Sequence, residues 1–155
     1  MGNKALKIAD KIGEGIGVGL MAGAVGTIAL TLCQMADMKL TGRKPGVGPA
    51  NALEKALGLR PKPGTKKQLS RKIHWVYGSL WGVARGILEA AGMNKWAATG
   101  AHFAAITGTG MALAPLEGQN PVTLWTKKEI AMEIAHNAVY AITVGLVFDA
   151  IFGTE

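Results

Sequence analysis

Mainly apolar segments alternate with polar stretches along the chain, and four of these segments have about the length of a membrane helix. They cover about residues 15–36, 73–90, 96–116 and 128–151. A helix needs about 20 largely apolar residues to cross the hydrocarbon core of a bilayer. The pattern therefore predicts an all-α fold, a four-helix transmembrane bundle in which residues 1–155 form one integral membrane domain. The second and fourth segments are short, so buried helices of a soluble bundle are the alternative.

The glycine content favours the membrane interpretation. The chain has 22 glycines in 155 residues, about twice the usual share of about 7%. Glycine is costly inside soluble helices but frequent in membrane helices, because it lets neighbouring backbones approach closely. Small residues recur at every fourth position in each segment, and we expect helix contacts, within the chain or between copies, at Gly15, Gly19, Gly23, Gly78, Gly82, Gly86, Gly100, Gly108 and Gly145.

The basic residues give the expected orientation. Of the 17 Lys and Arg, ten lie in the connector over residues 39–72 and two, Lys127 and Lys128, in the other long connector, which leaves five elsewhere. The positive-inside tendency places both connectors in the cytoplasm and both termini outside. We expect a short amphipathic helix to begin at Pro49 and to end at Gly58.

The same connector is the expected contact with anionic lipids, since basic residues near a membrane surface attract their headgroups. A solvated loop that only follows the orientation rule is the alternative. The concentration of the net charge of +7 in one connector argues against nucleic-acid binding.

Four ionisable residues lie in or near the expected spans: Asp37, His74, Glu133 and His136. Glu133 and His136 are one helical turn apart, and in an up-down bundle all four would occupy the cytoplasmic half. Two carboxylates and two imidazoles are a plausible ligand set for a divalent transition metal. Three alternatives stay open: a proton or ion relay, a haem or chlorophyll bound through His74, His102 or His136, and plain hydrogen bonds between helices.

Charged residues at the opposite end suggest an ion-pair cluster. Arg85 is expected to pair with Asp149, Glu14 or Glu89, and Glu89 follows Arg85 by one helical turn. We expect this set to fix the helices relative to one another.

The second and fourth segments open on related motifs. His74 and Tyr77 in "HWVYG" are echoed by His136 and Tyr140 in "HNAVY", which suggests two repeated helical hairpins. With "AGAVGT" in the first segment and the basic connector, these motifs resemble small bacterial inner-membrane proteins of the YagU-like kind. The resemblance covers about residues 15–150 and implies a multi-pass bacterial inner-membrane protein with no assigned reaction.

These patterns predict no catalytic residue, since no phosphate-binding loop, nucleophile elbow or zinc-peptidase pair occurs. The expected function is that of a small accessory or scaffold protein that packs through glycine-rich helices against partner subunits or against itself. The alternative is a protein that binds or moves a metal ion, proton or small solute at the polar residues of the cytoplasmic half.

Overall fold

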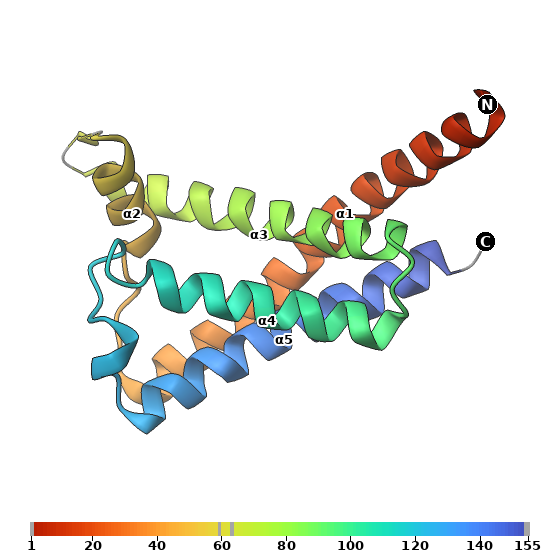
Figure 1. Ribbon diagram of the computed structural model, residues 1–155. Helices are drawn as coiled ribbons and strands as arrows, with labels where there is room; N and C mark the ends of the chain where they lie inside the picture. The colour runs from red at the N-terminus through yellow and green to blue at the C-terminus, as the bar shows by residue number, and fades with distance from the viewer. Residues whose placement is uncertain (1, 59, 63, 154–155) are drawn as a thin grey trace.

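The computed structural model describes residues 2–58, 60–62 and 64–153 of the chain. Over these residues the fold is entirely helical, without a strand (Figure 1). The elements are α1 (Gly2–Thr41), α2 (Gly48–Leu57), α3 (Lys66–Ala90), α4 (Lys95–Leu113), the 3-10 turn η1 (Val122–Leu124) and α5 (Lys127–Phe152). The predicted all-α class is confirmed for the described part of the chain.

Among the four long helices, α1 lies between α3 and α5, and α4 lies against α5. α1 makes its most extensive contact with α3 and also packs along α5, while α4 packs mainly against α5. Figure 1 shows both termini and the α3–α4 turn at one end, with α2 and η1 at the other. At that second end the side chain of Asn51 in α2 donates to the backbone oxygen of Glu117 at 2.8 Å, and Lys55 donates to that of Pro115 at 2.7 Å. The two long connectors therefore share one end of the bundle.

Local sequence signals explain where α2 begins and ends and where α4 and α5 begin. Pro49 lies in the first turn of α2, and Gly58 ends this helix in the left-handed region at φ 66°. Thr126 begins α5 with a capping box, in which its side chain and that of Glu129 satisfy each other's backbone amides. Asn94 begins α4 by accepting a hydrogen bond from the amide of Ala97 at 3.0 Å.

Helix bounds differ from the apolar segments because a helix continues for as long as its backbone stays hydrogen-bonded. α1 has 40 residues, a length of about 60 Å at about 1.5 Å per residue, and begins well before residue 15. α3 begins at Lys66, seven residues before the apolar segment at residue 73. Polar residues thus lengthen both helices beyond their apolar stretches.

In the described part of the chain two helices are long and apolar enough to cross a membrane: α1 over Ala9–Thr41, and α5. Only 28% and 33% of their most apolar stretches are buried inside the structure. A core helix of a soluble protein would be mostly buried. Most of the apolar surface of these two helices therefore points outward.

The segments at 73–90 and 96–116 are not supported as spans by their length and hydropathy alone. They lie in α3 and α4, and neither helix passes the criterion of length and hydropathy that α1 and α5 pass. α3 opens on a basic turn and carries the charge of Arg85, and the 19 residues of α4 include three threonines and a histidine. The length and hydropathy of α3 and α4 therefore do not support a four-helix transmembrane bundle.

A small apolar core lies between the helices. Its buried residues are Ala22, Ile106, Tyr140, Val144 and Phe148. Tyr140 places its ring in this core and donates its hydroxyl to the backbone oxygen of Gly78, so that α5 is tied to the backbone of α3. The core therefore holds all four long helices, with Ala22 from α1 and Ile106 from α4.

Candidate functional site

Six of the glycines singled out in the sequence lie where α1 and α3 cross, and all six are buried: Gly15, Gly19, Gly23, Gly78, Gly82 and Gly86. A methyl group on Gly19 would lie 2.5 Å from the carbonyl oxygen of Gly82, and one on Gly23 would lie 2.5 Å from that of Ser79. Such distances are below van der Waals contact, so the two backbones touch without side chains between them. Glycine is required here by close approach.

The remaining three glycines lie on the α4–α5 side and behave differently. A methyl group on Gly145 would lie 2.5 Å from the hydroxyl oxygen of Thr99, so that α5 approaches α4 closely at this point. Gly100 and Gly108 have no atom within 4 Å of a would-be methyl group. These two glycines therefore make no helix contact within the part of the chain that the structure describes.

Gly100 and Gly108 belong to an outward face of α4 without large side chains. Between residues 97 and 112 the exposed positions of α4 are all Gly or Ala: Ala97, Gly100, Ala104, Ala105, Gly108 and Ala112. The outward faces of α1 and α5 instead carry large residues such as Leu32, Ile142 and Leu146, which are 61%, 50% and 58% exposed. The α4 face, defined by these six residues, therefore carries no side chain larger than a methyl group.

Two of the four predicted metal ligands are held by other partners. Asp37, near the end of α1, forms an ion pair with Arg43 of the following connector. His74 of α3 lies with its Nε2 3.1 Å from the hydroxyl oxygen of Thr31 on α1. Each residue thus links elements locally and neither is directed into a shared site.

The other two lie on α5. Glu133 accepts a hydrogen bond from the side chain of Asn137 at 2.8 Å, and His136 is half-buried one turn further along. Over the residues that the structure describes, no three His, Cys, Asp or Glu side chains lie close enough to hold a metal ion. The structure does not bring the predicted ligand set together, because Asp37, His74 and Glu133 each lie with a different partner.

His102, a predicted haem or chlorophyll ligand, lies in the core. Its side chain is fully buried, with its ring 6.1 Å from that of Trp81 and 5.7 Å from that of Tyr140. Neither ring nitrogen forms a hydrogen bond of good geometry within the described structure. The aromatic packing on both sides makes His102 a packing residue of the core.

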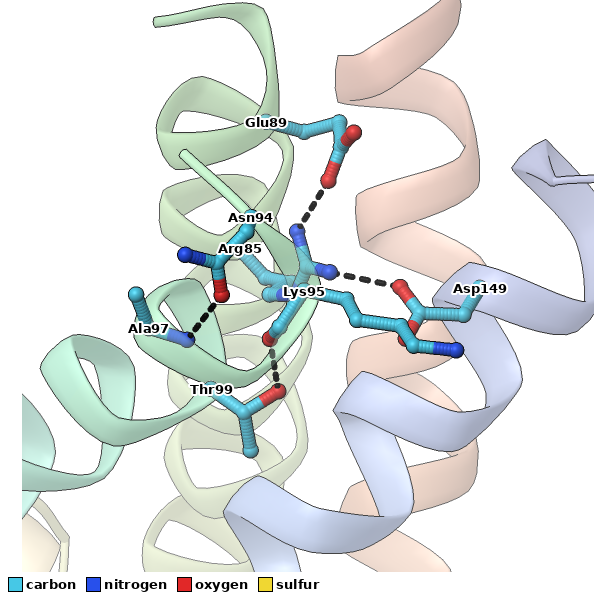
Figure 2. A network of polar contacts seen from close by, with 7 residues as sticks. All are labelled: Arg85, Glu89, Asn94, Lys95, Ala97, Thr99 and Asp149. Carbon is cyan, nitrogen blue, oxygen red and sulfur yellow. Dashed lines mark hydrogen bonds and ion pairs between the residues drawn. The ribbon is translucent and has the colours of Figure 1, made fainter. Parts of the chain in front are cut away.

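The ion-pair cluster centres on Arg85, whose side chain is fully buried (Figure 2). Its guanidinium donates to Glu89 of the same helix at 2.9 Å and to Asp149 of α5 at 2.5 Å. The guanidinium carbon also lies 4.7 Å from the centre of the Phe148 ring, in cation–π geometry. Arg85 therefore joins α3 to α5, while Glu14, the other acid predicted for this cluster, is exposed on α1.

Two adjoining hollows next to this cluster were not predicted. The larger, of about 250 Å³, is lined by Glu89, Lys95, Phe148, Asp149, Phe152 and Gly153. The smaller, of about 100 Å³, is lined by Lys95, Trp96, Thr99, Ile142, Gly145, Leu146 and Asp149. The spacing of Phe148 and Phe152 by one helical turn is the only sequence signal for this site, and their rings stack at 5.2 Å.

The connector end is strongly basic. Its exposed cations come from the end of α1, the connector, the start of α3 and the start of α5: Lys39, Arg43, Lys44, Lys55, Arg60, Lys62, Lys67, Arg71, Lys72, Lys127 and Lys128. Among the described residues at this end, two ion pairs form, between Arg43 and Asp37 and between Lys66 and Glu54. Most of the positive charge at this end is thus left facing solvent. The second connector also holds Glu117: burial raises the pKa of its carboxyl group, and the negative charge of Glu133 raises it further.

No family model, curated protein or solved structure matches this chain. The resemblance to YagU-like proteins stays a prediction, and the function has to be inferred from the geometry.

Proposed function

We propose that the protein is a multi-pass integral membrane scaffold of a bacterial inner membrane, with all four long helices in the bilayer. The observation that carries the proposal is the outward apolar surface of α1 and α5, most of which no other part of the chain covers. Exposed Leu, Ile, Val and Met side chains on two helices of this length form a surface that lipid tails would solvate.

The proposal includes α3 and α4 because their apolar stretches hold a single charged side chain, Arg85, which is paired with acids. Arg85 is the one charged residue of α3 between positions 73 and 88, and two acids neutralise it. α4 has no charged residue after Lys95. Ionisable groups at membrane depth occur paired and turned toward the bundle interior, as Arg85 is.

The basic connector end would face the cytoplasm, and both termini would lie outside, under the positive-inside tendency. The unpaired cations of this end would attract anionic lipid headgroups. This arrangement uses the clustering of both long connectors at one end of the bundle.

The α4 face would bind the transmembrane helix of a second copy or of a partner subunit. Small residues let helix backbones approach closely in lipid, where van der Waals contact drives association. Gly and Ala at every exposed position from 97 to 112 leave a shallow surface that suits such an approach. The rival function, a metal, proton or solute site, has no comparable support, since three of its four residues, Asp37, His74 and Glu133, lie with separate partners.

A single cysteine at position 104 tests the scaffold proposal. In a Cys33→Ser background, Ala104→Cys is expected to form a disulfide-linked dimer in native membranes under mild oxidation, because the α4 faces of two copies would meet there. Leu32→Cys, on the outward face of α1, is the matched control and is expected to stay monomeric. Equal cross-linking of both variants, or a monomer in both cases together with no co-purifying membrane subunit, would refute the contact surface.

A further inference from the structure

The two hollows beside Arg85 differ in the residues that line them. They adjoin, since Lys95 and Asp149 line both of them. The larger hollow has charged walls and the stacked rings of Phe148 and Phe152, whereas the smaller one runs between α4 and α5 beside the exposed side chains of Ile142 and Leu146. The larger hollow, which has charged groups in its walls, thus adjoins a smaller and more apolar one.

The larger hollow has hydrogen-bond donors and acceptors that no described residue uses. Arg85 uses Oε2 of Glu89 and Oδ1 of Asp149, so each carboxylate keeps a second oxygen without a hydrogen bond in the described structure. The ammonium group of Lys95 likewise forms no ion pair or hydrogen bond among the described residues, and Figure 2 shows its side chain extended beside Asp149. Unused groups of both signs lie around one hollow.

A ligand that matches these charges is zwitterionic. Its anionic phosphate would pair with Lys95 at the first turn of α4, where the positive end of the helix dipole also favours an anion. Its primary ammonium, with three donors, would bond the free oxygens of Glu89 and Asp149. A choline group has no such donors, and a glycerol headgroup has no positive charge.

We propose that this site binds phosphatidylethanolamine, with its headgroup in the larger hollow and an acyl chain along the smaller one. The larger hollow, of about 250 Å³, is smaller than the pockets of about 300–1,000 Å³ that hold drug-sized ligands. It therefore suits the headgroup alone, with the acyl chains outside this hollow. Trp96, 69% exposed at the start of α4, is placed as a residue of an interfacial aromatic belt would be. This inference rests on the proposed membrane location.

Native mass spectrometry of the full chain in mild detergent tests the site, with palmitoyl-oleoyl phosphatidylethanolamine, phosphatidylcholine and phosphatidylglycerol added in equal amounts. Lys95→Gln removes the phosphate partner, and Ile142→Trp fills the apolar hollow. Each is expected to lower the phosphatidylethanolamine adducts by about fivefold or more and to leave phosphatidylglycerol adducts unchanged. Lys128→Gln, at the connector end, is the matched control and is expected to keep the phosphatidylethanolamine adducts.

The outcomes separate the site from the membrane proposal. A membrane-embedded protein whose phosphatidylethanolamine adducts survive both variants, or whose three lipids fall together, overturns the lipid site alone. A chain that stays monodisperse without detergent overturns the membrane location and the lipid site with it.

Discussion

Replacing Gly19 with Ala is expected to destabilise the folded protein by about 2–3 kcal/mol, the upper part of the usual cost of forcing extra volume into a packed interior. The new methyl group would lie 2.5 Å from the carbonyl oxygen of Gly82 and 3.1 Å from the α-carbon of Val83. Both contacts are with backbone, which cannot rotate away as a side chain can. α1 and α3 would have to separate, and the hydrogen bond from Tyr140 to Gly78 would weaken with them.

Gly17→Ala is the matched control, two residues away on the same helix. Gly17 is exposed and has no atom within 4 Å of a would-be methyl group, so this change is expected to alter stability by no more than about 1 kcal/mol, in the stabilising direction. Unfolding by sodium dodecyl sulfate in detergent micelles, followed by circular dichroism, measures both variants. Equal stability of Gly19→Ala and Gly17→Ala would show that the α1–α3 contact is looser than described.

The second large effect is expected from leaving Arg85 without its acids. The double variant Glu89→Gln and Asp149→Asn should lose about 3 kcal/mol, near the lower end of the range for breaking a buried pair. The lower end applies because the two acids are 27% and 29% exposed, so water already screens them, while Arg85 is fully buried. The same unfolding titration provides the measurement.

Adding Arg85→Met to the double variant is expected to restore most of the lost stability. Methionine has a similar length, leaves no buried charge, and can pack against the Phe148 ring beside which the guanidinium lies. A triple variant as unstable as the double variant would mean that the loss comes from packing around the acids and not from the unpaired charge.

The sequence allowed the fold class and the two apolar helices to be predicted because both depend on local patterns. The uncharged, mainly apolar stretches at 15–36 in α1 and 134–148 in α5 can be recognised without knowledge of their neighbours. The bounds of α2 followed from Pro49 and Gly58, whose backbone preferences are also local. The glycines raised an expectation of close contacts but not of which helices would meet.

The candidate sites were harder to predict because they depend on how helices turn toward one another. Glu133 and His136 do lie one turn apart, but spacing along α5 does not place them beside Asp37 or His74 on other helices. The structure gives Asp37 a partner six residues away, Arg43. No sequence pattern singled out Lys95, because the hollow that it lines also needs Asp149, which is distant in sequence.

Quenching by lipids with brominated acyl chains shows whether all four long helices lie in the bilayer. Single cysteines carrying a bimane label at Val25, Leu80, Ala105 and Leu146, one exposed position on each long helix, report whether lipid tails surround the bundle. We expect quenching by brominated lipid at all four positions and little quenching by aqueous iodide. Iodide quenching at Leu80 and Ala105 with lipid quenching at Val25 and Leu146 would contradict the four-helix arrangement, and iodide quenching at all four would contradict the membrane location itself.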